Sequence, residues 1–162
     1  MKKVGIVMGS DSDLPVIQKA TDLLKKLEIP FEVHVYSAHR TPEQARAFAV
    51  SARENGFGVL IAAAGMAAHL AGAIAANTTL PVIGIPCKGP VLDGMDALLS
   101  TVQMPSGIPV ASVGINNGAN AALLAAEILS VEDPDLAARL QLKRTRDTAA
   151  VLEKDAGIAA RL

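Results

Sequence analysis

The chain has 162 residues, of which 51% are hydrophobic and 19% charged, and its net charge is −1 at neutral pH. This length suits one domain, residues 1–162, and the lack of a basic excess argues against nucleic acid as a partner. No apolar run approaches the ~18 residues of a membrane span, and a single cysteine excludes a disulfide or a cysteine-based zinc cluster within the chain.

Short apolar runs alternate with longer stretches of helical periodicity, the pattern of successive strand–helix units. The first run is too short for a secretory signal and lacks its cleavage site, so we expect a cytoplasmic protein. The predicted strands are residues 3–8, 31–37, 59–64, 81–86 and 109–115. The predicted helices are residues 13–27, 41–55, 67–77, 93–103 and 119–129. Most of the strands are apolar throughout, which indicates burial on both faces and a parallel three-layer α/β sandwich.

Residues 133–162 have a different character. Asp133-Pro134-Asp135 is typical of a helix start, and we expect a charged helix from there to about residue 154, with no strand after it. Leu136, Leu140 and Arg144 recur at helical spacing and give the helix one face for packing. This face fits a neighbouring subunit or the chain's own domain equally well. The apolar surplus of the whole chain also suggests buried subunit interfaces.

The turns after the strands are the places to look for function, because open parallel sheets bind ligands outside the carboxyl ends of their strands. The first turn offers Gly9, two hydroxyls on Ser10 and Ser12, and a helix N-terminus that favours a phosphate. The alternative is simple helix capping by Ser12 or Asp13. The turn matches neither a Walker loop nor a GxGxxG fingerprint.

The second turn, after residue 37, brings His39, Arg40 and the Thr41 hydroxyl to the same edge of the sheet. Arginine suits bidentate phosphate binding, and histidine transfers protons near neutral pH. A lone histidine in a turn is often only a surface residue or a helix cap, but its adjacency to Arg40 favours the functional interpretation. His34 lies within a predicted strand and is expected to be structural.

The third turn is rich in small residues, so a ligand or another backbone could approach it closely, and it offers His69 as a second imidazole. The alternative explanations are that the small residues only allow tight helix packing and that His69 only bonds to the backbone. The fourth turn, residues 87–94, has glycine and proline at hinge-like places and could act as a lid, although Lys88 could equally be solvated. Asn116-Asn117-Gly118 after the last strand resembles an asparagine-rich helix cap.

Several chemistries are excluded by what the sequence lacks. It has no GxSxG or HExxH motif and no spacing of histidines and carboxylates that forces a metal site. A flavin is disfavoured because the chain has no tryptophan and its other aromatic residues fall in or next to predicted elements. The residues therefore predict a small ligand that carries a phosphate, with acid–base chemistry by His39.

Five motifs occur in the order found in one enzyme family, and the likeness covers residues 4–129. The motifs are Gly9-Ser10-Asp11-Ser12-Asp13, Ser37-Ala38-His39-Arg40-Thr41-Pro42, Ala67-Ala68-His69-Leu70, Gln103-Met104-Pro105-Ser106-Gly107 and Asn120-Ala121-Ala122-Leu123-Leu124-Ala125-Ala126. With these motifs the chain closely resembles the 5-(carboxyamino)imidazole ribonucleotide mutases, also called phosphoribosylaminoimidazole carboxylase catalytic subunits.

The resemblance implies a flavodoxin-like sandwich of five parallel strands, assembled into an octamer on which the C-terminal helical extension packs. It implies an aminoimidazole ribonucleotide as substrate, no metal, biotin or ATP, and a functional link to the ATP-dependent synthetase that makes that substrate. His39 would be the general acid and base. Carbon dioxide would leave the exocyclic nitrogen, stay trapped, and add to carbon 4 of the ring. The implied substrate-binding residues are Gly9, Ser10, Ser12, Asp13, Ser37, Ala38, Arg40, Gly65, Ala68, His69 and Leu70.

Two residues depart from the family's pattern: Met66 stands where a second glycine is more frequent, and Ala71 where proline is. Because methionine is bulky, we expect ordinary φ at Met66 and a change in the shape of the pocket. The family's second class carboxylates aminoimidazole ribonucleotide directly and is marked by lysine after the histidine of the second motif. Arg40 and the turn at 103–105 favour the mutase class. The alternatives that stay open are this direct carboxylase and a non-catalytic nucleotide-sensing domain.

Overall fold

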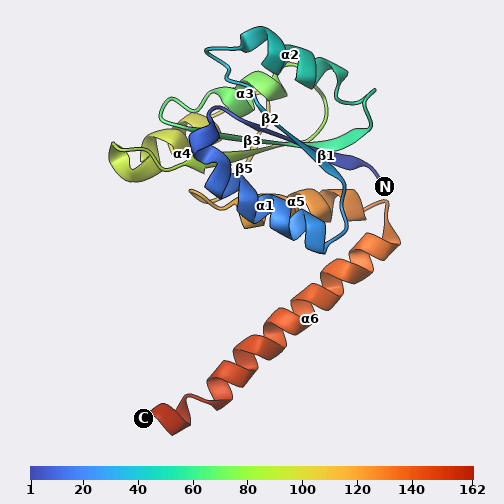
Figure 1. Ribbon diagram of the computed structural model, residues 1–162, viewed down its shortest axis with the longest axis vertical. Coiled ribbons are helices and arrows are strands. Elements are labelled where there is room, and N and C mark those ends of the chain that lie inside the picture. The colour runs from blue at the N-terminus through green and yellow to red at the C-terminus, as the bar shows by residue number, and fades with distance from the viewer.

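A five-stranded parallel sheet forms the centre of the computed structural model, which describes all residues from 1 to 162. Its order is β2-β1-β3-β4-β5, so the chain reverses its direction of winding beside β1 and β3 (Figure 1). This confirms the flavodoxin-like α/β/α sandwich expected from the sequence. The strands are β1 (Lys3–Met8), β2 (Phe31–Val35), β3 (Phe57–Gly65), β4 (Val82–Cys87) and β5 (Ala111–Ser112).

Helices cover both faces of the sheet (Figure 1). Helices α1 and α5 pack on one face, and α2, α3 and α4 pack on the other. Because both faces are covered, residues of β1, β3 and β4 are buried along almost their full length. The helices are α1 (Leu14–Lys26), α2 (Pro42–Ser51), α3 (Leu70–Ala75), α4 (Met95–Val102), α5 (Gly118–Ser130) and α6 (Pro134–Ala156).

Helices α1 and α5 approach each other closely because small residues face the contact. The buried side of α5 is made of alanines, including Ala121 and Ala125, which have no exposed surface. At Gly118 an added Cβ would lie 2.1 Å from the backbone oxygen of Val16. Only glycine fits there, so this position fixes how near the start of α5 can come to α1.

The strands agree well with the sequence prediction except at the edge, where β5 is much shorter than the predicted 109–115. It pairs with β4 only at Ala111 and Ser112. Pro109 has no N–H for the ladder, and Asn116 has a φ of 56° that turns the chain away. Helix α3 is also shorter than predicted, since residues 66–69 form a turn and not its first turn of helix.

Helix α6 projects away from the sandwich (Figure 1). The Asp133 side chain accepts a hydrogen bond from the Leu136 N–H at 2.9 Å, so the predicted N-cap is confirmed. Leu136 and Leu140 are its only buried residues, and both pack in the core cluster that contains α5. The first turns of α6 therefore lie on its own domain, while the later turns extend beyond it. No helix in the structure is long and apolar enough to cross a bilayer.

Candidate functional site

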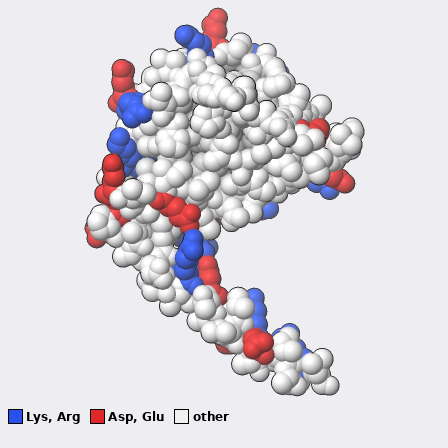
Figure 2. All heavy atoms as spheres, turned by 180° about the vertical axis from the view of Figure 1, so that it is seen from behind, with Lys and Arg blue, Asp and Glu red and all other residues white.

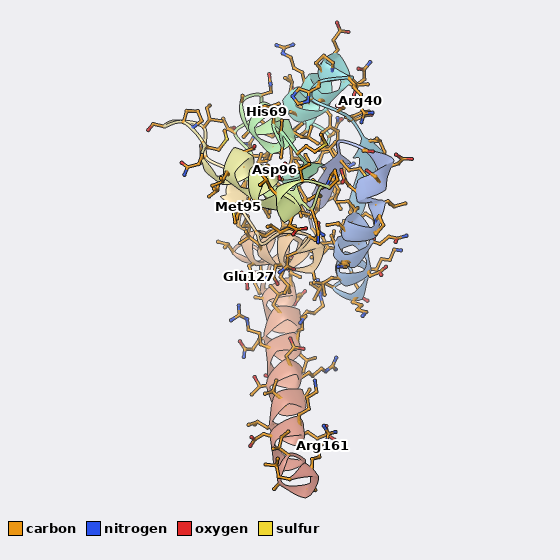
Figure 3. The ribbon with its side chains drawn as sticks, turned by 90° about the vertical axis from the view of Figure 1, so that its left-hand side faces the viewer. Arg40, His69, Met95, Asp96, Glu127 and Arg161 are labelled. Carbon is orange, nitrogen blue, oxygen red and sulfur yellow. The ribbon has the colours of Figure 1, made fainter.

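A cavity of about 560 Å³ opens at the carboxyl edge of the sheet, between the turns that follow β1, β2, β3 and β4. It gathers every site residue expected from the sequence except Ala68, which is buried and does not line it. Figure 3 shows Arg40 and His69 at this end of the molecule, far from Arg161 at the tip of the C-terminal segment. The lining residues are Gly9, Ser10, Ser12, Asp13, Ser37, Ala38, His39, Arg40, Ala64, Gly65, Met66, Ala67, His69, Leu70, Lys88, Gly89 and Pro90.

The turn after β1 presents a cluster of hydroxyls. The Ser10 side chain accepts a hydrogen bond from the Ser12 N–H at 3.3 Å and one from the Ser12 hydroxyl at 2.9 Å. Ser10 thus caps the short 3-10 turn Asp11–Asp13, whereas Asp13 makes no capping bond to α1. The capping residue of this turn is therefore Ser10, and not Ser12 or Asp13 as the alternative supposed. The Asp13 carboxylate is not used for capping.

Ser37 organises the turn after β2. Its hydroxyl accepts hydrogen bonds from the backbone N–H groups of His39 at 3.3 Å and Arg40 at 3.2 Å. The Thr41 hydroxyl accepts a hydrogen bond from the Ser37 N–H at 2.8 Å and makes no capping bond to α2. These bonds hold the tight turn that carries His39 and Arg40.

Arg40 links the first two turns of the cavity. Its Nη2 donates to the backbone oxygen of Gly9 at 2.7 Å. The side chain is exposed on the cavity side, so its other N–H groups remain available to a ligand. This geometry places a permanent positive charge beside the hydroxyls of Ser10 and Ser12.

His39 and His69 meet in the cavity, with His39 Nε2 at 3.0 Å from His69 Nδ1 and the rings at 83° to each other. In such a bond one nitrogen carries the proton and the other supplies the lone pair, which couples the tautomers of the two rings. His69 makes no capping bond to α3. The alternative that it only bonds to the backbone is therefore wrong.

The turn after β3 contains an unexpected backbone conformation. Met66 has a φ of 55°, which is in the left-handed region, and its side chain is 62% exposed. The expectation of ordinary φ at Met66 is wrong. The chain must reverse sharply between Gly65 and His69 to keep both on the cavity, and this geometry prevails over the side chain's preference.

The β4–α4 loop forms the remaining wall of the cavity through Lys88, Gly89 and Pro90. The Asn116 side chain accepts a hydrogen bond from the Lys88 N–H at 2.8 Å, an anchor that the sequence analysis did not identify. The Lys88 ammonium lies 2.8 Å from the Asp93 carboxylate, so Lys88 is ion-paired and not simply solvated. This pairing lowers the pKa of Asp93 and raises that of Lys88.

The Asp13 carboxylate is half-buried at the inner side of the cavity. Burial raises its pKa above the ordinary value, and hydrogen bonds from the Cys87 thiol and the Ser10 backbone offset part of that shift. Burial also raises the pKa of the Cys87 thiol to about 12, and the charge of Asp13 adds to the rise. Cys87 is therefore a hydrogen-bond partner of Asp13 and not a nucleophile near neutral pH.

A larger groove of about 850 Å³ lies at the opposite edge of the sheet, beside Arg53, Asn77 and Pro109. It contains no histidine and no cysteine. Size alone does not identify a site, and the chemistry-bearing residues converge in the smaller cavity. No group of three or more His, Cys, Asp or Glu residues is arranged to hold a metal ion.

Comparison with known proteins places the site in context. A family model described as AIR carboxylase matches residues 3–150. The N5-carboxyaminoimidazole ribonucleotide mutase of Pyrococcus abyssi is 56% identical over 89% of this chain and 83% of its own length. The phosphoribosylaminoimidazole carboxylase of Saccharomyces cerevisiae is 55% identical over 85% of this chain but only 24% of its own. The crystal structure of Treponema denticola PurE aligns with a TM-score of 0.84 and 29% identity, covering 94% of this chain and 96% of that one.

Proposed function

The chain belongs to the AIR carboxylase family, and from that premise we propose that it is a mutase acting in purine biosynthesis, with His39 as its proton-transfer residue. It converts N5-carboxyaminoimidazole ribonucleotide into 4-carboxy-5-aminoimidazole ribonucleotide. The observation that carries the proposal is the pairing of His39 with His69 inside the cavity, in a chain 56% identical to a mutase.

The phosphate of the ribonucleotide binds beside Arg40, where the hydroxyls of Ser10, Ser12 and Ser37 gather. Arginine donates in a planar fork that matches two phosphate oxygens, and the start of the following helix adds a favourable dipole. The Asp13 carboxylate would repel a phosphate but accepts bonds from ribose hydroxyls. This difference orients the ribose toward Asp13 and the phosphate toward Arg40.

The reaction moves one carboxyl group, and the protons balance through His39. The bond between the carboxyl carbon and the exocyclic nitrogen breaks, its electron pair stays on nitrogen, and His39 gives that nitrogen a proton. Carbon 4 of the ring then attacks the released carbon dioxide and forms a carbon–carbon bond. His39 takes the proton that carbon 4 loses, so the enzyme returns to its starting state.

His69 and the small lining residues serve this chemistry in different ways. The hydrogen bond between His69 and His39 orients the imidazole that must act first as an acid and then as a base. Ala64, Gly65 and Ala67 leave room for the ring next to His39. A cavity that excludes water keeps carbon dioxide beside the ring, and this confinement contributes to the rate.

The decisive experiment mixes the purified protein with freshly prepared N5-carboxyaminoimidazole ribonucleotide, without ATP or added metal, and follows the product by ultraviolet absorbance. His39→Asn should lower turnover by about 100-fold or more, since it removes the proton donor. It should leave substrate affinity within a few-fold, because asparagine keeps a polar group in the turn.

His34→Asn is the matched control. His34 lies in β2, stacked on Tyr36 and outside the cavity, so its loss should leave turnover unchanged. Equal turnover in the parent and His39→Asn would remove His39 from its role. A parent that is inactive on this substrate but active on aminoimidazole ribonucleotide with bicarbonate would be a direct carboxylase. Binding without turnover in the parent would indicate a nucleotide sensor.

We further propose that the protein is a homo-oligomer, an octamer by family resemblance. Apolar side chains on α4, namely Met95, Leu99 and Val102, are each about half exposed, and Val151 and Leu152 on α6 are 63% exposed. Figure 2 shows uncharged surface between the charged groups of the projecting helix. Monomers seldom expose such apolar helix faces, which supports contact with further copies of the chain.

An ATP-dependent synthetase that carboxylates the exocyclic nitrogen is the proposed functional partner, in the cytoplasm. In the yeast relative the matching segment fills 24% of a longer chain, which is consistent with an activity joined to others. A coupled assay that supplies aminoimidazole ribonucleotide, bicarbonate, ATP and the synthetase should yield product faster with this protein present than without it.

A further inference from the structure

The β4–α4 loop is the wall of the cavity with the weakest connection to the rest of the fold. Lys88, Gly89 and Pro90 line the cavity and lie outside every helix and strand. Their backbone makes no hydrogen bond to another backbone group. The turn after β2, by contrast, is held by several hydrogen bonds to the hydroxyls within it. The place of the loop beside the cavity therefore depends on a side chain from elsewhere.

That side chain belongs to Asn116, in the turn between β5 and α5. Its carbonyl oxygen accepts a hydrogen bond from the Lys88 N–H at 2.8 Å, and its own backbone N–H donates to the oxygen of Pro86 at 2.9 Å. Asn116 thus bonds first to β4 and then to the residue that follows it. These two bonds continue the contact of β4 with its neighbour past Ser112, where β5 ends.

Asn116 acts on the cavity only through the loop, because it does not line the cavity itself. Its φ of 56° is left-handed, a conformation that asparagine tolerates better than most residues. The next residue has a separate task, since the Asn117 side chain accepts a hydrogen bond from the Asn120 N–H at 3.1 Å and caps α5. Two neighbouring asparagines therefore accept one backbone hydrogen bond each, one at the cavity wall and one at a helix start.

We propose that Asn116 is a positioning residue for substrate binding, which holds the β4–α4 loop in place against the bound ribonucleotide through its hydrogen bond to Lys88. This inference rests on the proposed function. A loop that is already held loses little conformational freedom when a ligand binds, whereas a free loop must be ordered at the expense of affinity. His39 and His69 lie on other turns, so the proton transfer does not depend on this bond.

The variant that tests this is Asn116→Gly. Glycine adopts a φ of 56° freely, so the substitution removes the hydrogen-bond acceptor without adding backbone strain. With N5-carboxyaminoimidazole ribonucleotide as substrate, KM should rise about tenfold, because the loop must then be ordered on binding. The value of kcat should stay within about twofold, since the acid–base residues are untouched. Asn116→Asp keeps an oxygen for the Lys88 N–H and should keep KM within about threefold of the parent.

A matched control and a direct readout separate positioning from stability. Asn117→Ala removes one hydrogen bond of the same kind from the start of α5, so it should lower stability but keep both KM and kcat. Amide hydrogen exchange of the free proteins, measured by mass spectrometry, follows the bond itself. The peptide that contains Lys88 should lose about one protected amide in Asn116→Gly and none in Asn117→Ala.

The outcomes distinguish the inference from the function on which it rests. A parent that forms no product contradicts the proposed function, and the inference falls with it. With an active parent, an Asn116→Gly variant that keeps the parent's KM overturns the role of Asn116. An equal rise of KM in Asn117→Ala overturns it as well, since the effect would then follow lost stability. A rise in Asn116→Asp equal to that in Asn116→Gly would also contradict it, because the acceptor would not be the cause.

Discussion

At the scale of single residues, Asp13 is the side chain whose ionisation the fold opposes. It is half-buried, and the Cys87 thiol and the Ser10 backbone donate hydrogen bonds that only partly offset the desolvation of its charge. A buried carboxylate with a raised pKa is maintained where a ligand requires it. Its place in the proposed ribose site supplies that requirement.

Asp13→Asn should therefore stabilise the free protein at neutral pH and weaken substrate binding. The raised pKa means that the folded state binds the Asp13 proton more tightly than the unfolded state does. The stability that this residue contributes is thus complete below its unfolded pKa and is lost as the pH rises through its folded pKa. Asparagine carries no charge, so its advantage should appear above that window and vanish below it.

Urea unfolding of the parent and Asp13→Asn at several pH values between about 3.5 and 7 measures this difference, since a shift in the denaturant midpoint at constant slope reports a change in stability. Substrate affinity at neutral pH should fall by roughly tenfold, because one hydrogen bond to a charged group is lost. An Asp13→Asn advantage that is equal at every pH would contradict the assignment, since it would not follow ionisation of Asp13.

Sequence patterns predicted which residues meet in the cavity but not how the backbone brings them there. The turns after the strands were visible from composition, and His39, Arg40 and His69 do converge. The left-handed conformation at Met66 was not predicted, because methionine seldom adopts it, whereas asparagine, as at Asn116, tolerates it. At Met66 the conformation is imposed by the surrounding chain and leaves no signal in the residue type.

At the scale of elements, the close contact of α1 with α5 fixes one side of the cavity, because α1 begins directly after the turn that carries Ser10 and Asp13. The inner strands were easy to predict, because strands that are buried on both faces are continuous apolar runs in the sequence. Edge strand β5 was predicted too long, and α3 was predicted to begin too early. Their limits depend on pairing partners and turn geometry, which composition does not encode.

Gly118→Ala should destabilise the protein by about 2 kcal/mol, since overpacking a tight contact forces the backbone to shift. The added methyl group would meet the Val16 backbone oxygen at 2.1 Å, and that oxygen cannot move without displacing α1. Thermal and urea unfolding measure the loss. Gly114→Ala is the control, because its nearest neighbour would be 3.8 Å away. Equal effects of the two variants would contradict the contact.

At the scale of the whole molecule, one chain supplies the whole sandwich, but it does not supply a packing surface for most of α6. The helix has 23 residues and is about 34 Å long at 1.5 Å per residue. Isolated helices gain little stability from their own hydrogen bonds, and most of it comes from packing of one face. Since only Leu136 and Leu140 are buried, the later turns require a partner surface.

The double variant Val151→Glu with Leu152→Glu should therefore weaken self-association without unfolding the domain. Burying two such side chains contributes several kcal/mol per contact, so the dissociation constant should rise by about 100-fold or more. Light scattering across a range of concentrations should give the parent a mass that is a multiple of 16.7 kDa and the variant a smaller one. Gln141→Glu with Thr145→Glu adds the same charge to exposed polar positions of α6 and should leave the parent's mass unchanged. A parent that stays monomeric at every concentration would contradict the oligomer, and a double variant with the parent's mass would show that the α6 arm is not its interface.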